Sequence, residues 1–226
     1  DIGSWDVSSG EDFHSMFSLA TNFDQDIGDW DVSKGTNFAY MFYEADTFYQ
    51  DLSSWTINEN ASLNSMFEGA DRMQGVGDTP SIYYFNPYVF TDKNTLQTAI
   101  DAWIEDPDAA KETYGEINGW DVSEISDFSS LFEDKSTFNS DISNWDVSNG
   151  TNFSRMFYSA SDFNQDIGSW DVSNGTNFDS IFERATSFNQ YIGSWDVSNG
   201  NDFGEMFRDA SQFNQDIRSW DVSNVS

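Results

Sequence analysis

Residues 163–187 read FNQDIGSWDVSNGTNFDSIFERATS, and this 25-residue pattern recurs along most of the 226-residue chain. Tryptophans stand 25 residues apart in two series: Trp5, Trp30 and Trp55, then Trp120, Trp145, Trp170, Trp195 and Trp220. Phenylalanine follows each complete unit's Trp by twelve residues, at Phe17, Phe42, Phe67, Phe132, Phe157, Phe182 and Phe207. One unit is too short to bury its own apolar residues, so successive units must stack to form a core.

Each unit also carries signals for local structure. The stretch from Trp170 to Val172 combines aromatic and β-branched residues, which favours a short strand. Asn174-Gly175 indicates a turn, because both residues tolerate positive φ. Apolar residues at helical spacing over 178–185 favour a short helical or 3₁₀ turn. The sequence therefore predicts an α/β solenoid of leucine-rich-repeat-like coils, each with one short parallel strand and one short helical or 3₁₀ turn.

The repeat pattern divides the chain into four segments. We expect a first array of three coils with a truncated start at residues 1–75, and a linker loop at 76–91. The segment 92–119 contains an amphipathic helix predicted from Asn94 to Ile104, and stacked coils need such a cap over their exposed ends. Residues 120–226 then form a second array of four coils and a partial one.

Composition excludes several classes of function. The chain has 40 acidic residues, 9 basic residues, a net charge of −31, one histidine and no cysteine. Such a surface repels nucleic acid and anionic lipid, so neither is an expected partner. No apolar run reaches the roughly 20 residues that span a bilayer, so we expect no direct membrane insertion. No pair of carboxylates stands out from the repeat and His14 is single, so we expect no catalytic activity.

Aspartates form two columns across the units. One column follows Trp directly, and the other precedes it by four residues, starting at Asp1. Stacked carboxylates repel one another, and calcium favours sites made of six to eight oxygens. The candidate calcium ligands are Asp26, Asp31, Asp141, Asp146, Asp166 and Asp171. The alternative is that these side chains are solvated or cap turns by accepting backbone N–H groups. The pattern requires no cofactor, and calcium is the one candidate ion.

Five sequons offer candidate sites of N-glycosylation. They lie at Asn60, Asn149, Asn152, Asn174 and Asn224. They matter only if the chain passes through a eukaryotic secretory pathway.

The repeat resembles that of a known family. Units such as Phe163–Asn174, FNQDIGSWDVSN, resemble the BspA-like leucine-rich-repeat surface proteins. The segment Leu96–Ile104, followed by Tyr114–Ser123, resembles the segment that opens an array in that family. The resemblance covers residues 1–73 and 92–226, and departs from the family at Gly175 and Phe178 and at the equivalent positions of other units. It implies an extracellular or surface-anchored protein that has no catalytic activity.

Two functions fit these features. The first is a cell-surface or extracellular protein that mediates adhesion through a protein or glycan partner, with any leader or anchor outside this segment. The alternative is a structural subunit of an extracellular filament or sheath, assembled from copies of itself by end-to-end stacking and stabilised by calcium.

Overall fold

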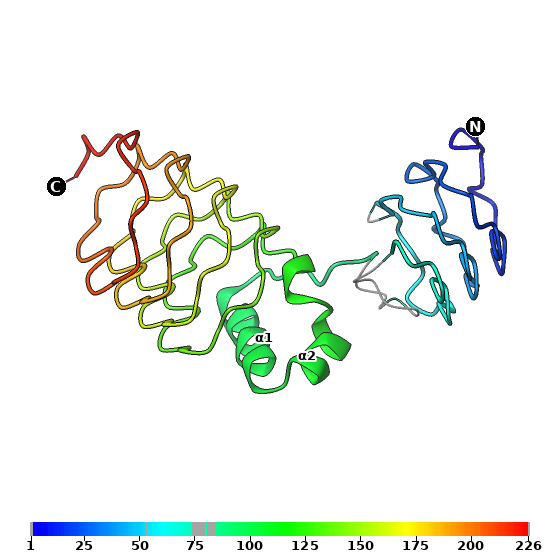
Figure 1. Cartoon of the computed structure of the whole chain (residues 1–226), viewed down its shortest axis with the longest axis horizontal. Helices are drawn as coiled ribbons and strands as arrows, with labels where there is room; N and C mark the ends of the chain where they lie inside the picture. Colours follow the sequence, from blue (N-terminus) through cyan, green and yellow to red (C-terminus); the bar gives the residue numbers. More distant parts are fainter. Residues whose placement is uncertain (1, 53, 74–79, 81–84, 226) are drawn as a thin grey trace. The chain divides into compact units, whose positions relative to one another are not determined.

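The chain folds into two compact units, Asp1–Pro87 and Tyr88–Ser226, and each contains a stack of coils (Figure 1). The computed structural model describes residues 2–52, 54–73, 80 and 85–225. Asp1 of the aspartate column and residues 76–79 and 81–84 of the predicted linker lie outside the described residues.

The predicted strand and helical turn of each coil are wrong. The helices of the described residues are α1 (Lys93–Glu105), α2 (Pro107–Tyr114) and the 3₁₀ helix η2 (Ile117–Gly119), and all precede Trp120. In the same residues no strand forms, and parallel pairing is limited to isolated bridges such as Asn152 with Asn177. The α/β, leucine-rich-repeat-like fold class is therefore incorrect, since each coil consists of turns and extended links.

Left-handed residues explain why no helical turn forms. In the coil of Trp170, Ser180 and Arg184 have φ of 52° and 59°. The same two positions, ten and fourteen residues after Trp, have positive φ in every complete coil: Ser15, Leu19, Tyr40, Glu44, Ser65, Gly69, Ser130, Asp134, Arg155, Ser159, Glu205 and Asp209 besides these two. A helix requires successive residues at negative φ, so these residues interrupt the one predicted over 178–185.

Backbone hydrogen bonds join each coil to the next. The N–H groups of Phe178, Ser180, Phe182 and Arg184 donate to carbonyls 24 residues later, over 2.7–3.0 Å. Between these donors, Ile181 N–H donates to the carbonyl of Phe178 at 3.3 Å and closes a turn within the coil. Positive φ at the third residue of such a turn is what a type II turn requires. The turns therefore aim alternate N–H groups at the neighbouring coil.

The core is a set of stacked aromatic columns, as the repeat predicts. Trp rings of neighbouring coils stack with centroids 6.3–6.4 Å apart, as in the pairs Trp5–Trp30, Trp30–Trp55, Trp120–Trp145 and Trp195–Trp220. The indole N–H of Trp170 donates to the carbonyl of Ile142 in the preceding coil at 3.2 Å. Within a coil the ring of Phe157 stacks on Phe163 at 4.0 Å, and both side chains are fully buried. Each column thus buries apolar area and also fixes the register between coils.

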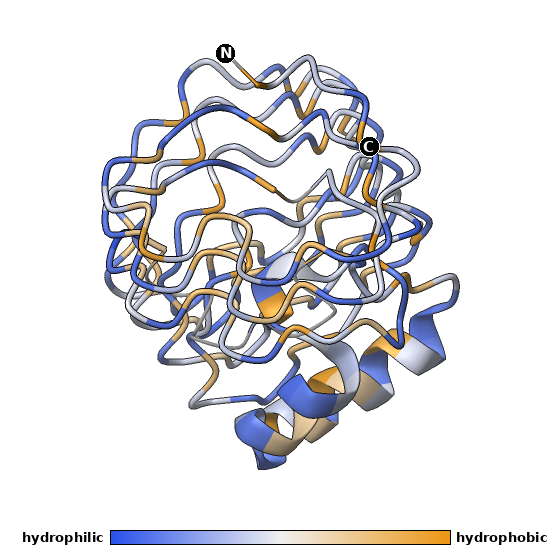
Figure 2. Ribbon diagram, turned by 90° about the vertical axis from the view of Figure 1, so that its right-hand side faces the viewer, coloured by the Kyte–Doolittle hydropathy of each residue, from blue (hydrophilic) through white to orange (hydrophobic). Residues whose placement is uncertain are grey.

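Helix α1 covers the first coil of the second unit. Asp92 caps it by accepting from the N–H groups of Asn94 and Thr95, and hydrophobic and hydrophilic residues alternate along its ribbon (Figure 2). Gln97 donates its side-chain amide to the carbonyl of Leu131 at 3.0 Å, and the indole of Trp103 donates to Ser140 Oγ at 2.9 Å. The helix thereby supplies hydrogen-bond donors and apolar side chains to the first coil of the second unit, as a preceding coil does for the later ones. No helix of the described residues is long and apolar enough to cross a bilayer.

Candidate functional site

The six aspartates predicted as calcium ligands all cap turns. Each Oδ1 accepts the backbone N–H two residues later, over 2.9–3.1 Å, in Asp26, Asp31, Asp141, Asp146, Asp166 and Asp171. Hydrogen bonds from the hydroxyl and N–H of the serine two residues later, Ser33 or Ser173, lower the pKa of Asp31 and of Asp171. Within the described residues no three acidic or histidine side chains are grouped as a metal site would need. Turn capping accounts for the column, and calcium binding stays a prediction.

The sequon asparagines differ in how the fold uses them. Asn149, Asn174 and Asn224 donate their side-chain Nδ2 to a serine carbonyl of the preceding coil, over 2.6–2.8 Å. Asn152 caps a turn through Oδ1, which accepts the N–H of Ser154. Asn60 is exposed in a turn that Asn58 caps. Glycosylation of any of the five stays a prediction.

Three positions differ strongly from coil to coil, and we call them the variable face. They stand ten, thirteen and fourteen residues after each Trp. Successive coils place there Ser15, Ser18 and Leu19; Tyr40, Tyr43 and Glu44; Ser65, Glu68 and Gly69; Ser130, Glu133 and Asp134; Arg155, Tyr158 and Ser159; Ser180, Glu183 and Arg184; Glu205, Arg208 and Asp209. The interleaved position at twelve is always Phe. Because the backbone ladder keeps the coils in register, these variable side chains form columns along each stack.

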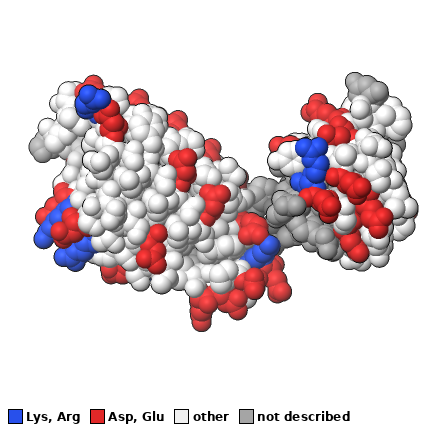
Figure 3. Space-filling model, in the orientation of Figure 1, with Lys and Arg blue, Asp and Glu red and all other residues white. Residues whose placement is uncertain are grey.

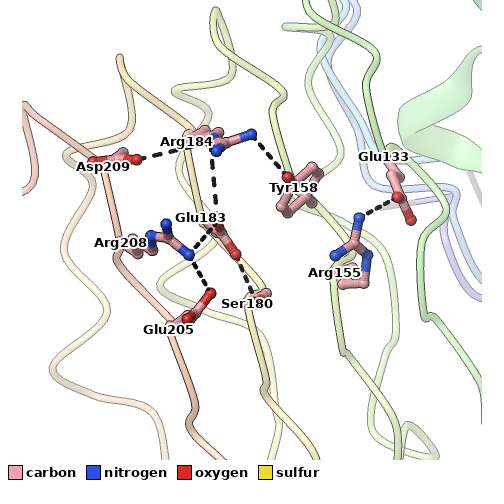
Figure 4. A network of polar contacts seen from close by, with 9 residues as sticks. All are labelled: Glu133, Arg155, Tyr158, Ser180, Glu183, Arg184, Glu205, Arg208 and Asp209. Atoms are coloured by element: carbon pink, nitrogen blue, oxygen red, sulfur yellow. Dashed lines mark hydrogen bonds and ion pairs between the residues drawn. The ribbon is translucent and has the colours of Figure 1, made fainter.

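In the second unit the variable face carries an arginine network (Figure 4). Arg155 forms an ion pair with Glu133, which lowers the pKa of Glu133 and raises that of Arg155. The guanidinium of Arg155 also lies 3.8 Å from the ring centre of Tyr158. Arg184 Nη1 donates to the hydroxyl of Tyr158 at 3.0 Å. A tyrosine is thus held between two arginines from neighbouring coils.

Glu183 is the buried centre of the same network. Its side chain is 4% exposed and accepts a hydrogen bond from Ser180 Oγ at 2.9 Å. Arg208 Nη1 lies 3.6 Å from Glu183 and 2.8 Å from Glu205, which lowers the pKa of Glu205. Three arginines therefore meet a comparable number of carboxylates.

Elsewhere acidic side chains are scattered widely over the visible surface, whereas Lys and Arg occur at few places (Figure 3).

In the first unit the variable face, together with His14 next to it, carries an aromatic and apolar patch. We call His14, Leu19, Tyr40 and Tyr43 the Tyr40 patch. The ring of Tyr40 meets those of His14 and Tyr43 edge-on, both at 5.9 Å between centroids. The backbone N–H of Leu19 donates to the carbonyl of Tyr43 at 2.7 Å, so the backbone of Leu19 lies beside that of Tyr43 on the next coil. The four residues thus come from two neighbouring coils.

Sequence reasoning missed both surfaces, although one signal was present. Arg155, Arg184 and Arg208 are among only nine basic residues, yet they occupy the same five-residue window of three successive coils. His14, the single histidine, is exposed.

Comparison with known proteins identifies the family. The model of the family described as "Mycoplasma protein of unknown function, DUF285" matches residues 1–80, 103–199 and 176–226. A search of curated proteins and a search of solved structures each gave no match. The resemblance to the BspA-like leucine-rich-repeat proteins is therefore wrong as an assignment, because the matching repeat model is a different one. This chain belongs to the DUF285 family, whose model covers most of both its repeat arrays.

Proposed function

We propose that this chain is a non-catalytic binding module whose variable face contacts a protein or glycan partner outside the cell or at its surface. The single observation that carries the proposal is that large aromatic, cationic or aliphatic side chains, such as Tyr40, Arg155 and Leu19, replace small ones at positions ten, thirteen and fourteen after Trp. Between them, position eleven is always Met, Leu or Ile and position twelve is always Phe, and most of these side chains lie in the core. Repeat proteins commonly bind through such a surface, built on a constant scaffold.

The scaffold suits recognition because it holds the variable residues in place. Positions ten and fourteen each donate a backbone N–H to the next coil, as Arg155 does to Asp179 at 2.9 Å and Ser159 does to Glu183 at 2.8 Å. Their side chains take no part in that ladder. A surface whose backbone is already ordered loses little conformational entropy on binding. The residue types also fit, since Tyr and Arg are enriched among the residues that dominate binding energy.

The proposal includes no catalytic step. On the variable face Glu133 and Glu205 pair with arginines, and carboxylates that directly follow Trp, such as Asp171, cap turns. The pKa values of Glu133, Glu205 and Asp171 are lowered, whereas burial raises the pKa of Asp179, which directly precedes Ser180 of the variable face. A general acid needs a carboxyl whose pKa is raised toward the working pH, and the pKa values of Glu133, Glu205 and Asp171 shift in the opposite direction.

Ligand selection with the purified chain tests the proposal. A random peptide library displayed on phage and a glycan array would be probed with the wild type, then with Tyr40→Ser, Tyr158→Ser and Arg184→Ser variants. Glu124→Ser serves as the control, since Glu124 is exposed and lies only four residues after its Trp. Ligands lost with a variable-face substitution and kept with Glu124→Ser would support the proposal. No ligand from either collection, or ligands indifferent to every variable-face substitution, would refute it. Ordered filaments of the purified chain in electron micrographs would instead favour the structural alternative.

A further inference from the structure

Two residues of the Tyr40 patch adopt a backbone conformation that is unfavourable for their residue types. Leu19 has φ of 61° and Tyr40 has φ of 58°. Bulky L-residues are rare in this left-handed region, and residues held there destabilise the fold unless something else compensates. Their side chains are 62% and 40% exposed, so burial in the core compensates little.

The fold itself does not need bulky side chains at these positions. At ten residues after Trp the other coils often carry serine, as at Ser15, Ser65, Ser130 and Ser180. At fourteen residues after Trp they accept glycine, serine or aspartate, as at Gly69, Ser159 and Asp134. Small or polar residues therefore satisfy the same backbone geometry. Leu19 and Tyr40 combine strain with apolar exposure, and this pattern points to a contact that the isolated chain does not make.

The rim of the patch is acidic. Glu44 follows Tyr43 and forms a hydrogen bond with its hydroxyl, which raises the pKa of Tyr43. Glu44 N–H donates to the carbonyl of Glu68 at 2.8 Å, so a second carboxylate lies on the adjacent coil. Unlike the arginine network, this rim brings carboxylates beside aromatic rings with few cations, since the first 87 residues contain only Lys34 and Arg72 as basic residues.

We propose that the Tyr40 patch is a docking surface for a protein segment that presents an apolar or aromatic side chain flanked by lysine or arginine. The inference rests on the proposed function and names its partner. Leu19 favours a protein over a glycan, because an exposed aliphatic side chain finds its complement in apolar side chains. The rim carboxylates of Glu44 and Glu68 complement flanking cations and repel acidic segments.

Selection of phage-displayed random peptides on the intact chain tests this inference. We expect enriched peptides that combine aromatic or aliphatic residues with lysine or arginine. Their affinity should fall by about tenfold or more with Tyr40→Ser or Leu19→Ser, as for a central contact residue. Tyr49→Ser is the matched control, because Tyr49 is 65% exposed in the same unit but stands outside the patch, and it should leave affinity unchanged.

Unfolding measurements separate docking from a structural role. Tyr40→Ser and Leu19→Ser should keep or raise the urea midpoint of unfolding, since serine occupies equivalent positions in other coils. A lowered midpoint would show that these side chains hold the fold together, and it would overturn the inference. Three results would overturn the inference while leaving the proposed function standing. They are enriched peptides without basic residues, glycan binding at the patch, and peptide binding that is lost with Arg184→Ser but not with Tyr40→Ser. Absence of any peptide or glycan ligand would overturn both.

Discussion

Replacing Ser159 by glycine should stabilise the second unit, although glycine usually weakens ordered structure. Ser159 has φ of 55° and its N–H donates to the carbonyl of Glu183 at 2.8 Å, a bond that glycine keeps. An L-residue in the left-handed region costs about 1–2 kcal/mol. Glycine loses more backbone entropy on folding, which costs about 0.5–1 kcal/mol. The difference predicts a gain of about 0.5–1 kcal/mol in the free energy of unfolding.

Ser154→Gly provides the matched control in the same coil. Ser154 is not among the left-handed residues, and its N–H donates to Asn152 Oδ1, which glycine also preserves. Here only the entropic cost applies, so the free energy of unfolding should fall by about 0.5–1 kcal/mol. Urea unfolding followed by tryptophan fluorescence would measure both variants. If the two variants lose stability equally, the left-handed backbone does not govern these positions, and the account of the coil given above fails.

Three further substitutions or conditions probe other parts of the fold. Gly69→Ala should lower stability by about 1 kcal/mol or more, because Gly69 has φ of 76° and an added Cβ would lie 2.9 Å from Glu44 Cγ, and thermal unfolding would measure the loss. Trp170→Phe should lower it by more than about 1 kcal/mol in the same assay, because a buried carbonyl of the preceding coil loses its indole donor. Hydrogen bonds from Ser173 lower the pKa of Asp171 in the fold, so the stability they contribute is present above the ordinary Asp pKa and is lost as pH falls through the lowered one. Asp171→Asn should therefore weaken the acid dependence of the melting temperature below about pH 4.

The repeat made the core predictable and left the coil conformation unpredictable. Constant spacing of Trp and Phe indicated which side chains stack, and the aromatic columns confirm it. The left-handed positions had no such signal. Glycine is the usual mark of positive φ, and only Gly69 carries it at these two positions.

The variable face was hidden for a related reason. Arg155 contacts Glu133 of the preceding coil, 22 residues earlier in sequence, and Arg184 contacts Tyr158, 26 residues earlier. Neither separation equals the 25-residue period, because the side chains reach across the columns diagonally. Finding these pairs from sequence would have required the turn geometry that aims each side chain.

The same geometry explains how one fold can present different surfaces. At positions ten and fourteen after Trp the backbone N–H joins the next coil, so the hydrogen bond survives any substitution except proline. The remaining constraint is positive φ, whose cost is modest beside the burial of Trp and Phe in every coil. Stability therefore resides in the columns beneath, and the side chains of the variable face can change with little effect on it. The Tyr40 patch and the arginine network are two surfaces made in this way, from one repeat, in the two units of a single chain.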